Sequence, residues 1–177
     1  MREILFRAKG RDGEGWREGY YWRTQDTTYC FAEDYDRSPD NVKHYLLFDQ
    51  MTDWGLPNLK LRMDIIPETL CQSAGLIDRN GKQIWENDIL MANGNPEDIY
   101  KVCFGEFGVM DMETEIITDK AVGWYLKVIP TEDILSTLKP FNADMPLNNI
   151  WIENCSLKVV GNIFDNPELI KAGDTHD

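Results

Sequence analysis

The residues between Asp78 and Asp88 carry a group of possible ligand oxygens in this 177-residue chain: Asp78, Asn80, Glu86 and Asp88 lie within 11 positions. Carboxylate and amide oxygens are what Ca²⁺ binds, and a loop of the EF-hand type needs them at positions 1, 3 and 5, with glycine at 6. With Gly81 at position 6, position 1 is Leu76, which has no side-chain oxygen. With Asp78 at position 1, position 5 is Lys82. Both registers fail, so we predict no metal site here.

The same residues have a second interpretation, as turn chemistry. Asp78 opens Asp-Arg-Asn-Gly, in which the first carboxylate bonds the backbone ahead of it and Gly81 takes a left-handed conformation, as in a type I turn with a G1 bulge. Asn87 is expected to have positive φ, and Asp88 is expected to bond backbone amides of the second turn. Trp85, between the turns, is predicted to be buried. This stretch is therefore scaffold, and any local site must be sought in the loops around it.

Other catalytic or metal-binding patterns are incomplete. The four cysteines, Cys30, Cys71, Cys103 and Cys155, are far apart, and a zinc site needs two close ligand pairs, so we predict buried free thiols. Such thiols fit a reducing cytoplasm.

Acid–base chemistry also lacks its usual groups. The two histidines are His44, expected as a surface or packing residue, and His176 in a frayed tail. Glu97, Asp98 and Lys101 are near one another without the rest of a nuclease pattern, and the acids of the segment DMETEII (residues 111–117) are expected on the solvent face of a strand. We therefore predict no enzyme, no catalytic, cofactor-binding or metal-binding residue, and no cofactor.

The charge of the chain restricts its partners. Thirty-one acidic residues against 18 basic ones give a net charge of −13. Binding of phosphates dominates affinity for nucleic acid, and the basic residues form no runs, so direct nucleic-acid binding is not expected. The acidic surface is interpreted as one that keeps the chain soluble. The alternative is that it imitates nucleic acid and binds a basic host factor. No long apolar stretch or signal peptide is present, so we expect no membrane partner.

The elements that carry these residues are mostly short strands. Alternation predicts an N-terminal hairpin from strands over 2–9 and 16–23, with a further strand over 27–32. Residues 33–64 are interpreted as an irregular insertion. A short helix is expected next, at 67–70. It is followed by strands over 100–104, 109–117 and 122–129, with a turn flanked by Gly105 and Gly108. A brief helix capped by Thr131 and a loop over 140–149 come after them.

The C-terminal part is expected to contain a strand over 157–163 and a helical turn capped by Asn166, with Leu169 and Ile170 docked. We predict a mostly β fold with a few short helices, in one domain over 1–177. Residues 1–64 form its hairpin and insertion, 65–170 a small barrel and 171–177 the tail.

Three segments resemble the YopX-like proteins of bacteriophages and prophages. The central one, IPETLCQSAGLIDRNGKQIWENDIL, is similar to the family's Pro-Glu-Thr, Gly-Leu, Asp-x-Asn-Gly-Lys and Ile-aromatic-Glu-Gly-Asp-Ile signature. The opening REILFRAKG and the closing VVGNIFDNPELI match the family's ends. Two positions depart from the pattern: Asn87 stands where glycine is usual, and Ser73-Ala74 where an aromatic-Thr pair is common.

The resemblance implies an SH3-like barrel and a tendency to form homo-oligomers, and it carries no established activity. We therefore expect a non-enzymatic binding or assembly module of phage or prophage origin, in the cytoplasm of the bacterial host. Its partners would be other copies of itself and a host or phage protein. An acidic nucleic-acid mimic that occupies a host factor is the alternative, and an enzyme of unknown class is a further one. The sequence does not name the partner, the stage of infection or the order of the oligomer.

Overall fold

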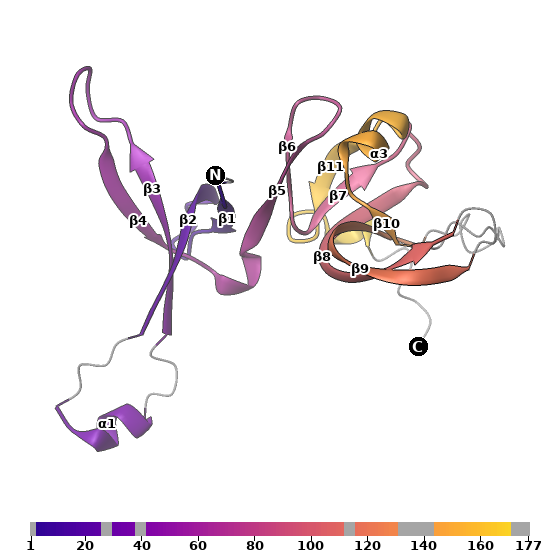
Figure 1. Ribbon diagram of the computed structural model, residues 1–177. Coiled ribbons are helices and arrows are strands. Elements are labelled where there is room, and N and C mark those ends of the chain that lie inside the picture. Colours follow the sequence, from indigo (N-terminus) through magenta and orange to yellow (C-terminus); the bar gives the residue numbers. More distant parts are fainter. Residues whose placement is uncertain (1–2, 26–29, 38–41, 112–115, 131–143, 171–177) are drawn as a thin grey trace. The chain divides into compact units, whose positions relative to one another are not determined.

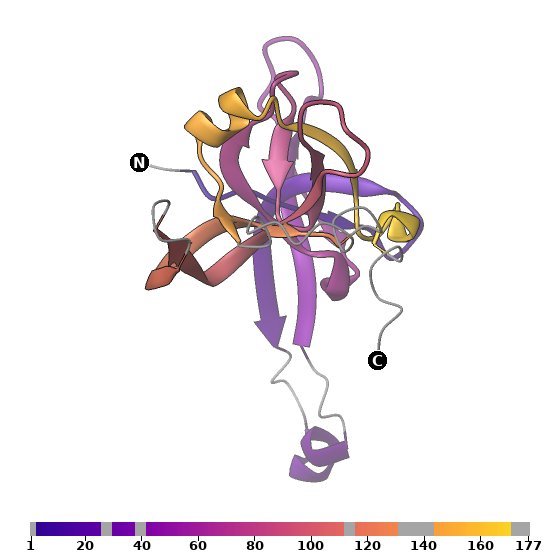
Figure 2. The ribbon, with the colours of Figure 1, turned by 90° about the vertical axis from the view of Figure 1, so that its right-hand side faces the viewer.

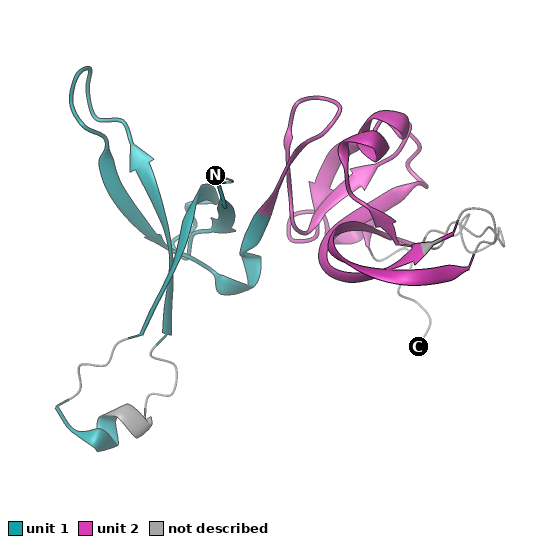
Figure 3. Ribbon diagram, viewed as in Figure 1, with its two compact units in different colours: residues 1–72 teal, residues 73–177 magenta. Residues whose placement is uncertain are grey.

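The computed structural model describes residues 3–25, 30–37, 42–111, 116–130 and 144–170. These residues are mostly in antiparallel strands, which confirms the mostly β prediction. The chain divides into two compact units, residues 1–72 and 73–177 (Figure 3). The sequence places its internal boundary earlier, after residue 64, and the single domain remains a prediction. The predicted tail, 171–177, lies outside the described residues.

The first unit is built from long hairpins (Figure 1). Its strands are β1 (Phe6–Lys9), β2 (Trp16–Gln25), β3 (Val42–Gln50) and β4 (Leu59–Asp64), hydrogen-bonded in the order β4-β3-β2-β1. The helix α1 (Ala32–Arg37) lies between β2 and β3, and the 3-10 turn η1 (Pro67–Thr69) follows β4. The core consists of Ala8, Leu46, Met63 and Ile65, with Phe6, Tyr21, Phe48 and Leu70 packed against it.

Two sequence predictions for this unit are wrong. Residues 33–64 are not an irregular insertion, because β3 and β4 pair over six residues from Tyr45↔Asp64 to Gln50↔Leu59, and β3 also pairs with β2. The predicted strand over 27–32 is not formed in its described part, since Cys30 and Phe31 are bends and Ala32 begins α1. The predicted N-terminal hairpin and the turn at 67–70 are confirmed.

β5 (Cys71–Ile77) continues from the first unit into the second. Cys71 and Gln72 pair with β1, whereas Ser73 and Ile77 pair with β6 (Gln83–Trp85). The second sheet has the order β10-β9-β8-β7-β11. Its strands are β7 (Asp88–Met91), β8 (Ile99–Met110), β9 (Ile117–Val128), β10 (Met145–Pro146) and β11 (Lys158–Asn162). The strand order does not close into a barrel among the described residues.

The longest pairing in the second unit joins β8 and β9, which run side by side from Tyr100↔Val128 to Met110↔Ile117 (Figures 1 and 2). The predicted turn flanked by Gly105 and Gly108 is wrong, because both glycines lie inside β8. Gly108 serves close packing instead: a Cβ there would lie 2.9 Å from Cγ2 of Ile117. β8 ends at Met110 and β9 begins at Ile117, and residues 112–115 between them lie outside the described part.

The core of the second unit is larger than that of the first. Ten buried residues form its main cluster, and a smaller cluster of Ile89, Ile99 and Ile129 has Leu169 and Ile170 packed against it. The sequence missed α3 (Asn149–Asn154), where the side chain of Asn148 accepts a hydrogen bond from the Trp151 amide at 3.0 Å. The predicted helix near Thr131 lies outside the described residues.

The C-terminal turn forms as predicted, as the 3-10 turn η2 (Pro167–Leu169), but its expected cap is absent. Asn166 makes no capping hydrogen bond. Its Oδ1 accepts instead from the Asn162 amide at 3.4 Å, and a Cβ on Gly161 would lie 2.3 Å from that oxygen. Gly161 thus lets the turn fold back on β11. None of the helices described is long and apolar enough to span a membrane.

Candidate functional site

Asp78 is the buried centre of the first candidate ligand group, and both its oxygens are occupied by backbone amides. Oδ1 accepts from Asn80 and Lys82 at 2.8 Å each, and Oδ2 accepts from Val159 on β11 at 2.9 Å. Gly81 has φ +81°, and its amide donates to the Asp78 carbonyl at 3.0 Å, as predicted for a type I turn with a G1 bulge. The bond to Val159, 81 positions away, had no signal in the sequence.

The second turn also follows the prediction. Asn87 has φ +64°, Oδ2 of buried Asp88 accepts from the Trp85 amide at 2.9 Å, and Trp85 is buried. Glu86 is half-buried beside them. The carboxylates of this stretch therefore hold two turns. Within the described ranges no three His, Cys, Asp or Glu side chains converge as metal ligands would.

The three residues of the possible nuclease group stand on the loop before β8 and on β8 itself. Glu97 is exposed in the loop before β8, and Lys101 lies on β8 itself. Asp98 is hydrogen-bonded to the Tyr100 side chain; burial first, and then this bond, raises the pKa of Tyr100. The Asp98 carboxylate thus has a structural partner, and the phenol stays neutral at any physiological pH. The acids of 111–117 remain untested, since 112–115 lie outside the described residues.

The four thiols have different environments. Cys71 is buried as predicted, Cys103 and Cys155 are half-buried, and Cys30 is exposed, so the prediction of burial is wrong for Cys30. Burial raises the pKa of both Cys103 and Cys155. A raised pKa lowers the thiolate fraction, so neither residue is an activated nucleophile.

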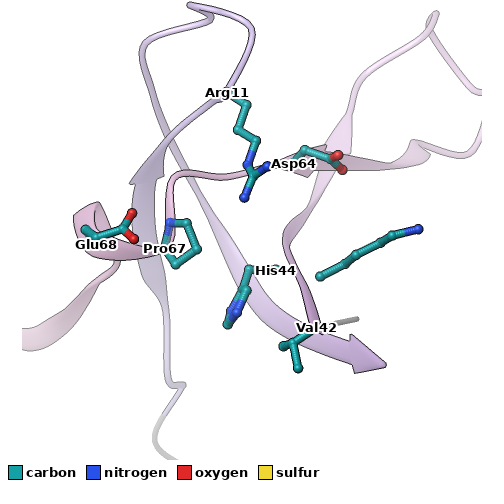
Figure 4. Close-up of a pocket in the computed structure, with 7 residues that line it drawn as sticks. Arg11, Val42, His44, Asp64, Pro67 and Glu68 are labelled. Carbon is teal, nitrogen blue, oxygen red and sulfur yellow. The ribbon is translucent and has the colours of Figure 1, made fainter. Parts of the chain in front are cut away.

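A pocket in the first unit has a volume of about 550 Å³. His44, predicted as a surface or packing residue, stands on β3 in its wall (Figure 4). Its Nδ1 is 2.6 Å from the Tyr21 hydroxyl, and the rings stack at 5.9 Å. Nε of Arg11 donates to the Ile65 carbonyl at 3.2 Å. The lining is completed by Val42, Lys43, Asp64, Pro67 and Glu68.

The pocket mixes charges of both signs, and its lining has no Ser, Thr or Cys nucleophile beside the histidine. Since His44 is hydrogen-bonded to the Tyr21 hydroxyl, the imidazole is held as a packing and hydrogen-bonding group. The arrangement suits a small polar ligand better than a covalent or acid–base reaction.

Among the described residues of the first unit, the most exposed large apolar side chain lies in the loop between β3 and β4. Trp54 is 90% exposed at its tip. The loop is nevertheless held by its own bonds: Oδ1 of Asp53 accepts from the Trp54 amide at 2.7 Å, the Asp53 carbonyl from the Leu56 amide at 3.2 Å, and the Pro57 carbonyl from the Thr52 hydroxyl at 3.2 Å. We call residues 51–59, which are the connection and the first residue of β4, the Trp54 loop. Its other exposed apolar residues are Met51, Leu56 and Leu59.

Comparison with known proteins gives a family match and a similarity to a solved structure. Residues 5–171 match the family described as YopX protein. The crystal structure of protein EF1440 from Enterococcus faecalis is similar to the chain with 16% sequence identity and a TM-score of 0.44, over 96% of this chain and 99% of that one. The search of curated proteins finds no match. Because the family match covers nearly the whole length, the chain belongs to the YopX protein family.

Proposed function

We propose that this protein is a non-enzymatic binding module of phage or prophage origin, which contacts a host or phage protein in the bacterial cytoplasm through the Trp54 loop. The observation that supports the proposal most strongly is Trp54 itself, 90% exposed on a loop with internal hydrogen bonds. An exposed tryptophan on a preorganised loop is the kind of residue that dominates protein interfaces, because its burial gives much energy for little lost freedom.

Neighbouring residues supply a surface of the right kind. Met51, Leu56 and Leu59 are each more than half exposed, and together with Trp54 they place four large apolar side chains within nine residues of one hairpin tip. Such a concentration is costly in water and is typical of interaction sites. Asp53 and Lys60 give the loop a polar border, as interface rims have.

The test compares Trp54→Ala with Phe31→Ala, which removes an exposed aromatic residue elsewhere in the same unit. Tagged proteins are purified from infected cells, co-purifying proteins are identified, and binding is measured with the purified partner. We expect W54A to weaken binding by about 30-fold or more, the effect of losing a hot-spot residue, and F31A to leave it unchanged. Equal capture by W54A and the wild type would overturn the proposal.

The acidic-mimic alternative gains support from the distribution of charge. Residues 1–72 contain ten basic and 13 acidic residues, whereas residues 73–177 contain eight and 18, so ten of the 13 net negative charges belong to the second unit. A mimic would compete with DNA for a basic host protein. Competition that persists in W54A would favour this alternative over the Trp54 loop.

One finer expectation about the fold remains a proposal. The SH3-like barrel applies to the second unit, where several short strands and tight turns surround a main core, as such barrels have. Direct nucleic-acid binding is not proposed, since the net charge of −13 opposes it. An enzyme is not proposed either, because the His44 pocket offers no described nucleophile.

A further inference from the structure

The His44 pocket is built from four separate elements of the first unit, and hydrogen bonds of the backbone join these elements. Its polar lining comes from the β1–β2 turn, the start of β3, the end of β4 and η1, which carry Arg11, His44, Asp64 and Glu68 in that order. The Arg11 amide donates to the Asp64 carbonyl at 3.0 Å, and the Ile65 amide donates to the His44 carbonyl at 3.1 Å. The walls of the pocket are therefore positioned before any ligand binds.

The charged side chains of the pocket do not neutralise one another. Its lining contains two basic residues, Arg11 and Lys43, and two acidic ones, Asp64 and Glu68. Both acidic residues are exposed, and among the described residues no ion pair joins either carboxylate to a basic side chain. Charges of both signs thus face one cavity of about 550 Å³ and are open to a bound group.

Arg11 is held in an orientation that suits a carboxylate. Its Nε donates to the Ile65 carbonyl at 3.2 Å, which fixes the plane of the guanidinium and leaves the two Nη groups for a ligand. A guanidinium binds a carboxylate through two parallel hydrogen bonds, and less freedom is lost when its plane is already fixed. In the view of Figure 4, the Arg11 side chain points toward His44, with Glu68 and Asp64 on either side.

His44 adds a hydrogen-bonding group of fixed direction. Its Nδ1 is engaged by the Tyr21 hydroxyl at 2.6 Å, and the two rings stack. Nε2 is therefore the ring nitrogen that a ligand in the pocket can reach. A polar group of the ligand placed between His44 and Arg11 would be oriented from two sides.

Glu68 stands on a turn that is joined to β1. The hydroxyl oxygen of Thr69, the next residue, accepts from the Lys9 amide at 2.9 Å and donates to the Ile66 carbonyl at 2.7 Å. The position of the Glu68 backbone is thus fixed relative to the turn that carries Arg11. A carboxylate at this place attracts a cationic group of a ligand that Arg11 binds by its anionic end.

We propose that the His44 pocket binds a small zwitterion with one carboxylate and one ammonium group, as an amino acid or a short free peptide has. Arg11 binds the carboxylate, Glu68 receives the ammonium group, and Nε2 of His44 orients the ligand. A ligand with charges of one sign only would meet side chains of that same sign. The volume falls in the range of small-molecule sites, roughly 300 to 1,000 Å³.

The first test compares probes on the wild-type chain by amide NMR. The probes are a mixture of the common amino acids, a mixture of free dipeptides, and the same dipeptides acetylated and amidated. We expect a free mixture to shift the amide signals of Arg11, His44 and Glu68 at about 1 mM, and the blocked dipeptides to need at least about tenfold more. The free mixture that acts at lower concentration identifies the source. No shift with either free mixture at about 10 mM, or equal shifts with the blocked one, would contradict the proposal.

The second test assigns each charge of the ligand to its residue. Arg11→Met and Glu68→Gln should each raise the dissociation constant of the tightest-binding compound by about tenfold or more in calorimetry. Amidation of that compound should no longer weaken binding to R11M, and acetylation should no longer weaken binding to E68Q. Arg79→Met and Glu153→Gln are the matched controls, because both residues are exposed in the second unit.

Wild-type affinity in both R11M and E68Q would show that the compound binds elsewhere. Circular dichroism checks that the variants fold, and the comparison of probes on the wild type needs no variant at all.

This inference and the proposed function fail separately. Trp54→Ala should bind the zwitterion like the wild type, and R11M should still bind the partner of the Trp54 loop. If R11M loses that partner while no free mixture shifts the amide signals, the pocket belongs to the protein-binding surface and the ligand inference is wrong.

Discussion

The two units of this chain are stabilised in different ways. The first has a core of four buried residues and depends on long hairpin pairing, with β2 and β3 paired over six positions. The second has a ten-residue core, and its turns are fixed by buried polar side chains, among them Asp78 and Asp88. A small apolar core is sensitive to loss of any one member, whereas a structure joined by buried carboxylates is sensitive to loss of a hydrogen-bond acceptor.

Asp78→Ala should have the largest effect on the second unit. The carboxylate accepts three backbone hydrogen bonds, one of which joins the β5–β6 turn to β11, and removal of the acceptor leaves buried amides without partners. We expect the free energy of unfolding to fall by about 4 kcal/mol. Urea denaturation measures the loss, and amide exchange should show it over residues 73–170. The control is Glu153→Ala, at an exposed position of α3, which should stay within about 0.5 kcal/mol of the wild type.

Leu46→Ala tests the other side of the comparison. Leu46 is fully buried in the small core of the first unit and pairs with Tyr21 and Met63 on its two neighbouring strands. The cavity should lower the stability of that unit by about 3 kcal/mol. Amide exchange should speed up in β2 and β3 and remain slow in β7 and β11. If exchange speeds up equally in both units, the two units unfold together. The difference in how they are stabilised then does not let one unit unfold without the other.

Sequence reasoning succeeded where the information is local. The turns at Asp78–Gly81 and Glu86–Asp88 are determined by which residues tolerate positive φ and which side chains reach nearby amides, and both are observed. It failed where pairing partners are remote. β3 and β4 contain charged residues such as Lys43, Asp49 and Lys60, and they become strands through pairing with each other and with β2.

The exposure of apolar side chains also could not be predicted from local sequence. A tryptophan beside glycine and proline predicts a loop, but only the fold shows that Trp54 is exposed. Phe104 and Val122 alternate as half-buried strand residues should, and nothing local distinguishes them from Val102 and Leu126, which the rest of the unit covers. Whether an apolar face is covered depends on contacts far away in sequence, so interaction surfaces of this kind cannot be predicted from periodicity.

Substitutions at Asn87 should have the smallest effect and separate turn conformation from packing. Asn87 has φ +64°, and its backbone groups bond Val102 and Ile163, so the turn joins β7 to two other parts of the second unit. Asn87→Gly should keep the free energy of unfolding within about 0.5 kcal/mol of the wild type. Glycine has no strain in the left-handed conformation, but this gain is offset by its greater freedom in the unfolded chain. Asn87→Ala should cost about 1 kcal/mol, since alanine is strained at this φ. Thermal unfolding of the two variants measures the difference, and equal loss in both would show that the Asn87 side chain, rather than its backbone conformation, stabilises the turn.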